Sequence, residues 1–230
     1  MARLLLIGNS RWHWAERQGQ RLRCWHEAPP QDPEALPADQ LLAWAAVGAL
    51  PERLNLPQQR RIRLADVPLQ GMPGWLGIDR ALVGWRAWRR QGGAVLVADA
   101  GTALSLTRVS AEGRFAGGRI SAGVALQLSA LGRATALLPS LQAPAAAIRD
   151  PWPQATEAAM VEGCIRATAA VVIQAWHDLP EAGRGGLWLT GGDAPLLLPV
   201  LQQQRHLRAE LAADLALEAM ACLPAVGLLA

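Results

Sequence analysis

Residues 94–109 read AVLVADAGTALSLTRV, and this stretch decides the fold class of the chain. Ala94 to Ala98 is a continuous apolar run, which predicts a short buried strand. Asp99 follows at the end of that strand, and Gly101-Thr102 predicts a turn. Leu104 to Val109 then predicts the return strand. The stretch therefore predicts a β-hairpin that carries a carboxylate at its bend.

The same pattern occurs near the N-terminus of the chain. Residues 4–10 read LLLIGNS, so that an apolar strand runs into the turn Gly8-Asn9-Ser10, and Trp12 to Trp25 continues as one or two returning strands. Two such hairpins predict an internal duplication, in which each copy is a β-rich half followed by helices. Two such halves facing each other would form a cleft with a phosphate loop on each wall.

The other predicted elements alternate between strands and helices, which is typical of an α/β protein. Residues 28–37 predict a loop, and Leu41 to Leu50 is ambiguous between helix and strand. Thr156 is the predicted N-cap of a long helix. The periodic patterns predict strands at Arg61–Leu69, Arg114–Ala116 and Gly186–Leu189, and helices at Leu76–Arg90, from Gly118 to about Leu138, Thr156–Trp176 and Ala194–Gln203.

The composition is that of a folded globular protein, with 230 residues, 51% apolar residues and a net charge of +3. This charge is too small to indicate nucleic acid or a membrane surface as a partner. No uninterrupted apolar run reaches the roughly 18 residues of a membrane span. All 22 basic residues are arginines, so phosphate chemistry here must use Arg, backbone N–H groups and metal ions. Three widely spaced cysteines and the lack of a cleavable signal favour a reducing, cytoplasmic location.

Four short stretches carry groups that suit phosphate or substrate chemistry. Gly8-Asn9-Ser10 offers backbone N–H groups, an amide and a hydroxyl. Asp99 is costly to bury at a strand end unless it binds a cation or a nucleotide. Asp79 and Arg80 suit a carboxylate base beside a guanidinium that grips an anion. Gly191-Gly192 let a ligand approach the backbone closely. Each stretch also has a structural alternative: a plain turn, an Asx-turn, a helix N-cap and an ordinary strand–helix turn, respectively.

The order of these stretches resembles that of the type III pantothenate kinases. Asp79 and Asp99 lie 20 residues apart, as they do in that family, and the resemblance runs from residue 4 to the C-terminal tail. It implies an ASKHA (RNase H-like) fold, as in actin and sugar kinases: two α/β halves with mixed sheets around a central cleft. The matching motifs are GNS at 8–10, GIDR at 77–80, DAGTA at 99–103, GGRISAG at 117–123, TEAAMVEG at 156–163 and TGGDA at 190–194.

The resemblance also implies domains, an activity and partners. Residues 1–93 would form the N-terminal half with the first phosphate loop and the GIDR motif, and residues 94–230 the C-terminal half. The activity would be ATP-dependent phosphorylation of pantothenate to 4′-phosphopantothenate, the first step of coenzyme A biosynthesis. The cofactors would be Mg²⁺ with the ATP and a monovalent cation, K⁺ or NH₄⁺. The protein would be a homodimer.

Residue roles follow from the same resemblance, position by position. Asp79 would be the general base that takes the proton of the substrate's primary hydroxyl group, and Arg80 would hold the substrate's carboxylate. Asp99 would bind the monovalent cation. Thr156 would contact pantothenate, in its own subunit or across the dimer. The ATP site would comprise Leu6, Ile7, Gly8, Asn9, Ser10, Arg11, Trp12, His13, Thr102, Gly191 and Gly192, and the pantothenate site Gln70, Gly77, Ile78, Asp79, Arg80 and Thr156.

Three positions depart from the pattern of the family. Leu6 stands in place of an aspartate that helps to hold Mg²⁺, Thr107 in place of a second aspartate, and Gln70 in place of a tyrosine. Two alternatives therefore stay open: a catalytically weak or inactive relative that binds nucleotide or ligand as a regulatory protein, and a kinase for another small hydroxylated acid. An active pantothenate kinase is favoured because four residues occur together: Asp79, Arg80, Asp99 and Thr102.

Overall fold

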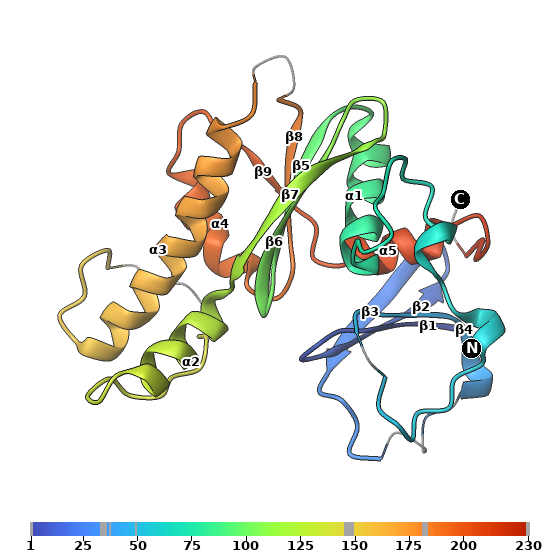
Figure 1. Cartoon of the computed structure of the whole chain (residues 1–230), viewed down its shortest axis with the longest axis horizontal. Helices are drawn as coiled ribbons and strands as arrows, with labels where there is room; N and C mark the ends of the chain where they lie inside the picture. The colour runs from blue at the N-terminus through green and yellow to red at the C-terminus, as the bar shows by residue number, and fades with distance from the viewer. Residues whose placement is uncertain are drawn as a thin grey trace. The chain divides into compact units, whose positions relative to one another are not determined.

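The computed structural model describes residues 2–32, 36, 38–48, 50–144, 150–180 and 184–228, and the chain forms two compact units (Figure 1). The first unit comprises Met1–Arg86 together with Asp214–Ala230, and the second comprises Ala87–Ala213. The C-terminal segment thus returns to the first unit. The predicted halves, 1–93 and 94–230, follow the internal duplication of the sequence, whereas these two units are defined by their compactness. The division into those halves therefore stays a prediction.

The first unit contains a four-stranded mixed sheet in the order β3-β2-β1-β4. The antiparallel pairs β1–β2 and β2–β3 form consecutive hairpins, whereas β4 lies parallel to β1. One face of the sheet packs a tryptophan-rich core, which includes Trp12, Trp14 and Trp44, and helix α5 (Leu215–Cys222) contacts β1 and β2. The strands are β1 (Arg3–Ile7), β2 (Trp12–Gln18), β3 (Arg21–Glu27) and β4 (Leu41–Ala46).

Short 3₁₀ helices connect this sheet to helix α1 (Ile78–Gln91), which begins in the first unit. The strand predicted at Arg61–Leu69 is wrong. Only Arg61 bridges to Trp44, and the Asp66 carboxylate accepts the backbone N–H of Arg63 at 2.7 Å, which closes a turn. Local side-chain hydrogen bonding of this kind competes with a strand ladder. The 3₁₀ helices are η2 (Ala38–Gln40), η3 (Gln58–Arg60) and η4 (Leu64–Asp66).

The second unit contains a five-stranded mixed sheet in the order β7-β6-β5-β8-β9. Strand β5 pairs antiparallel with β6 and parallel with β8, just as β1 pairs with β2 and β4. The repeated strand order agrees with the predicted duplication, and the prediction of α/β architecture with two mixed sheets is confirmed. The strands are β5 (Val95–Ala100), β6 (Ala103–Val109), β7 (Phe115–Ala122), β8 (Gly186–Thr190) and β9 (Ala209–Leu211).

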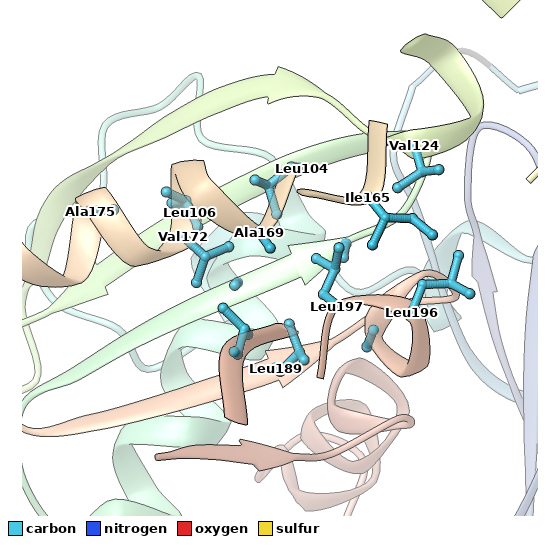
Figure 2. Packing of buried hydrophobic residues seen from close by; sticks show 14 of the residues in the cluster. Leu104, Leu106, Val124, Ile165, Ala169, Val172, Ala175, Leu189, Leu196 and Leu197 are labelled. Atoms are coloured by element: carbon cyan, nitrogen blue, oxygen red, sulfur yellow. The ribbon is translucent and has the colours of Figure 1, made fainter. Parts of the chain in front are cut away.

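Helices α2 (Val124–Ala134), α3 (Thr156–His177) and α4 (Ala194–Gln202) build the core of the second unit. Figure 2 shows leucines of β6 and β8 packing against apolar side chains of α3 and α4, among them Leu106, Val172 and Leu189. The helix predicted from Gly118 begins only at Val124, because β7 continues through Gly118 to Ala122 and pairs with β6. The N-cap of α3 is Ala155 rather than the predicted Thr156.

Helix α3 is the one helix among the described residues that is long and apolar enough to cross a membrane by length and composition. Half of its most apolar window is buried in the core of the second unit. The central helix of a soluble protein passes the same test, so this finding is weak support for a membrane span. Glu162 and Arg166 interrupt its apolar sequence and form an ion pair.

Candidate functional site

The first candidate phosphate loop is the turn between β1 and β2. The N–H of Gly8 donates to the carbonyl of Arg11 at 3.0 Å, which closes the turn. A Cβ at Gly8 would lie 2.8 Å from that carbonyl oxygen, so the turn requires glycine. Asn9, Ser10 and Arg11 are exposed, whereas their neighbours in the predicted ATP segment, Leu6, Ile7 and Trp12, are buried. The exposed part of this segment is therefore polar and carries one positive charge.

His13 lies directly behind this turn and begins a chain of polar contacts. Its Nδ1 lies 2.9 Å from Nδ1 of His26 on β3, and Nε2 of His26 lies 3.2 Å from Oδ1 of Asp214. Burial, followed by the charges of His26 and Arg11, lowers the pKa of His13 to about 4. Burial and the nearby Asp214 raise the pKa of the Cys24 thiol to about 12. His13 is thus held as a neutral imidazole at neutral pH.

His26 and Asp214 were not predicted as site residues. The hairpin β2–β3 pairs His13 with His26, because its turn follows Gln18. The dipeptide Gly19-Gln20 was the available signal for that register. Asp214 lies about 200 residues away in the sequence, and no local pattern connects it to the first hairpin.

The GIDR motif forms the start of α1. The carbonyl of Gly77 accepts the N–H of Ala81 at 3.1 Å, so Gly77 directly precedes the first turn of the helix. Burial raises the pKa of Asp79 above its ordinary range, although backbone N–H donation and the charge of Arg80 oppose that rise. A Cβ at Gly77 would lie 2.5 Å from Oδ1 of Asp79, so the carboxylate folds over the glycine. Asp79 is thus both a helix-terminal residue and a proton acceptor of raised pKa.

Arg80 is only 8% exposed. Burial lowers the pKa of its guanidinium, and the Asp79 carboxylate partly offsets that effect. A buried guanidinium beside a half-buried carboxylate suits the binding of an anionic ligand. Ile78 is buried and anchors the helix start, whereas the predicted substrate residue Gln70 is exposed, ahead of α1.

Three glycine-containing motifs converge at one end of the sheet in the second unit. Asp99 lies opposite Thr190 in the parallel pair β5–β8, and the N–H of Asp193 donates to the carbonyl of Ala100 at 2.8 Å. Gly191 has a φ of +90°, and a Cβ there would lie 2.5 Å from Oδ1 of Asp99. The structure therefore brings the predicted cation ligand Asp99 next to the predicted adenosine motif.

The GGRISAG segment reaches the same place from β7. The N–H of Gly123 donates to the carbonyl of Thr102 at 3.0 Å. A Cβ at Gly123 would overlap the carbonyl oxygen of Gly101, so only glycine permits this approach. Thr102 itself is exposed at the bend of the β5–β6 hairpin. Thr156 is also exposed, as the first residue of α3 in the same unit.

No group of three or more His, Cys, Asp or Glu side chains is placed to hold a metal ion within the described ranges. Two shallow cavities of the first unit, of about 300 and 260 Å³, contain none of the predicted site residues.

Comparison with known proteins gives a consistent result. A family model described as type III pantothenate kinase matches residues 59–178. The type III pantothenate kinase of Thermosynechococcus vestitus is 40% identical over 205 residues, which cover 86% of this chain and 80% of that protein. The enzyme of the same description from Synechococcus elongatus is 36% identical over 233 residues, which cover 91% of this chain and 92% of that protein.

Solved structures show the same fold at low sequence identity. A conserved protein from Campylobacter jejuni, described as a putative Baf family transcriptional activator, has a TM-score of 0.63 and 20% identity, with 96% of each chain covered. A putative 2-dehydro-3-deoxygalactonokinase from Sinorhizobium meliloti has a TM-score of 0.58 and 14% identity, with 99% of this chain and 97% of that chain covered. These likenesses support the ASKHA-type fold alone.

Proposed function

Because the chain belongs to the type III pantothenate kinase family, we propose that it transfers the γ-phosphoryl group of ATP to the primary hydroxyl group of pantothenate. This is the first step of coenzyme A biosynthesis. The observation that carries the proposal is the pair Asp79 and Arg80, a half-buried carboxylate of raised pKa and a buried guanidinium on the first turn of α1. Both lie within the segment that matches the family model.

Asp79 would accept the proton of the attacking hydroxyl group. Its raised pKa makes it a better proton acceptor than an exposed aspartate, since the strength of a base follows its pKa. Arg80 would bind the carboxylate of pantothenate and so fix the hydroxyl group near Asp79. Gly77 leaves the space that the Asp79 carboxylate occupies, and Ile78, Gln70 and Thr156 would complete the pantothenate pocket.

The nucleotide would bind to the glycine-containing motifs that the sequence predicts for it. Backbone N–H groups of Gly8, Asn9 and Ser10, together with Arg11, would hold phosphate oxygens. Thr102 would contact the phosphates, and Gly191 and Gly192 would lie beside the adenosine. Phosphoryl transfer of this kind relies mainly on positioning and on charge neutralisation, which needs no lysine.

The cation roles belong to this proposal as well. Asp99 would bind the monovalent cation, K⁺ or NH₄⁺, since its carboxylate lies near the carbonyl oxygen of Ala100 and a cation of this kind takes oxygen ligands. Mg²⁺ would enter with the phosphates of ATP and would neutralise the charge that develops during transfer. A cytoplasmic location also stays a prediction, which the free thiols of Cys24, Cys164 and Cys222 favour.

Release of ADP tests the proposal. With ATP and Mg²⁺, the wild-type protein should release ADP only when pantothenate is added, and more rapidly when K⁺ or NH₄⁺ is present. Asp79→Asn should lower the rate on the order of 10²-fold or more, whereas Glu52→Gln, an exposed carboxylate in the same unit, should leave it unchanged. ATP binding without pantothenate-dependent turnover would instead support a regulatory relative. Turnover with other hydroxy acids alone would support a different kinase.

A further inference from the structure

The segment that follows strand β4 adjoins the candidate phosphate loop of the first unit. Strand β4 runs parallel to β1, with Ala46 opposite Ile7, and the N–H of Val47 donates to the carbonyl of Ile7 at 2.9 Å. Gly48 comes next, and a Cβ at that position would lie 3.6 Å from Oδ1 of Asn9. Gly48 therefore lies beside the Asn9 carboxamide, just beyond the carboxyl ends of both strands.

Gly48 has a backbone conformation that other residues rarely adopt. Its φ is +150°, and the residue is exposed. Apart from its neighbours in the chain, the one described atom within 4 Å of a Cβ at Gly48 is Oδ1 of Asn9, at an ordinary contact distance. Crowding inside the protein therefore does not explain this glycine. Glycine in such a position is typical of a backbone that a ligand approaches closely.

The second unit repeats this arrangement at the candidate adenosine motif. Strand β8 runs parallel to β5, as β4 does to β1, and Gly191 follows β8 with a φ of +90°. A Cβ at Gly191 would lie 2.5 Å from Oδ1 of Asp99, near the end of β5. The duplicated strand order therefore makes Gly48 the counterpart of Gly191. Ligands of open α/β sheets bind beyond the carboxyl ends of the strands, where both glycines lie.

The groups exposed beside Gly48 favour an anion. The segments 6–13 and 47–48 contain no Asp or Glu. Asn9 and Arg11 are exposed, and among the described residues neither side chain has a hydrogen-bond or ion-pair partner. A carboxamide and a guanidinium both offer N–H donors, and backbone N–H groups of a turn add to them. A phosphate group, which is negatively charged and has several acceptor oxygens, matches this set of donors.

We propose that Gly48 contacts the phosphate groups of the nucleotide together with Asn9, so that the end of β4 forms the second side of the first phosphate site. A side chain at position 48 would occupy the space beside the Asn9 carboxamide and would strain the backbone. The proposal rests on the proposed kinase function for the identity of the nucleotide.

The backbone amide resonance of Gly48 tests this contact in the wild-type protein. Spectra that correlate ¹H with ¹⁵N are recorded during separate titrations with ATP, adenosine and pantothenate. ATP should shift the Gly48 resonance, whereas adenosine and pantothenate should leave it in place. The control is the amide of Gly19, in the β2–β3 turn at the opposite end of the sheet, which should move with none of the three. A Gly48 shift caused by adenosine or by pantothenate would overturn the proposal.

The variant Gly48→Ala tests the same contact through affinity, measured by calorimetry with ATP. The added methyl group should weaken ATP binding roughly five- to tenfold, the size of one lost hydrogen bond. Gly19→Ala is the matched control, since Gly19 also has a positive φ, of +65°, and nothing lies within 4 Å of its Cβ position. It should lose stability in urea but keep wild-type affinity for ATP. Wild-type affinity in Gly48→Ala, or an equal loss of affinity in both variants, would contradict the proposal.

The two levels of the proposal fail in different ways. A wild-type protein that binds no ATP would contradict the kinase function and the role of Gly48 together. Wild-type binding of ATP without a shift of the Gly48 amide would contradict the role of Gly48 alone.

Discussion

At the scale of single residues, Asp79 combines two demands on one carboxylate. It accepts backbone N–H groups in the first turn of α1, which favours the ionised form, and it is buried, which disfavours that form. Burial is the larger effect, so the pKa of Asp79 lies above that of an exposed aspartate. The sequence predicted both a helix-terminal and a catalytic role, and the geometry is compatible with both at once.

The raised pKa of Asp79 predicts the pH dependence of activity. A base must be deprotonated, so kcat/KM for pantothenate should fall as the pH drops through the pKa of Asp79. That acid limb should lie above the ordinary aspartate value of about 3.9. The measurement is a pH–rate profile of the wild type, with Glu52→Gln as a control of equal charge change. An acid limb at or below the ordinary value would remove Asp79 from the role of base.

The conformation of Gly191 predicts how much stability and ATP affinity the protein loses when one methyl group is added at the candidate adenosine motif. Its φ of +90° is strained for alanine, and the added Cβ would press against Asp99. Gly191→Ala should destabilise the protein by about 1–3 kcal/mol and weaken ATP binding, as measured by urea unfolding and calorimetry. Gly93→Ala is the matched control, since nothing lies within 4 Å of its Cβ position. Equal stability of the two variants would show that the turn adapts without cost.

At the scale of elements, several strands and helices were predicted correctly from neighbouring residues, whereas elements that depend on distant residues were not. The hairpin at 94–109 and the helix at 78–91 follow from apolar runs and from the glycines that bound them. The strand predicted at Arg61–Leu69 failed because Asp66 closes a local turn. Strand β9 and helix α5 were not predicted. Strand β9 has only three residues and pairs in parallel with β8, which lies about 20 residues earlier in the sequence. Parallel strands are not joined by a tight turn, so no turn residues in the sequence indicate that they pair.

Helix α3 provides the prediction at this scale. Ile165 is fully buried between the sheet and α4, within the core shown in Figure 2. Ile165→Ala should lower the free energy of unfolding by about 2–5 kcal/mol, as measured by urea unfolding. The exposed Ala170→Gly on the same helix should cost only about 1 kcal/mol. A smaller loss for Ile165→Ala than for Ala170→Gly would place Ile165 outside the core.

At the scale of the whole molecule, two units repeat one strand order, and the predicted roles fall on both. The first unit holds the first hairpin, Asp79 and Arg80, and the second holds Asp99, Thr102 and Gly191. Motif order in the sequence was sufficient to predict the fold and these candidates. The contact of His26 with Asp214 could not be predicted, because Asp214 comes from the returning C-terminal segment.

The homodimer is the prediction that concerns assembly. Large apolar side chains lie exposed on and around α2 and the segment that leads to α3, and unpaired apolar groups of this size favour a partner surface. Leu126→Asp should shift the protein from dimer to monomer in sedimentation velocity. Leu211→Asp, on β9, is the matched control. A wild-type monomer, or a Leu126→Asp dimer, would contradict this assignment. The exposed residues are Ile120, Leu126, Leu137 and Trp152.

Direct identification of the reaction product tests the central claim. The protein is incubated with ATP, Mg²⁺, K⁺ and pantothenate, and the products are identified by mass spectrometry and ³¹P NMR. The account predicts 4′-phosphopantothenate and ADP in equal amounts from the wild type, and almost none from a folded Asp79→Asn variant. A wild-type protein that binds ATP and pantothenate but forms no phosphate ester, or an Asp79→Asn variant that forms it at the wild-type rate, would contradict the account.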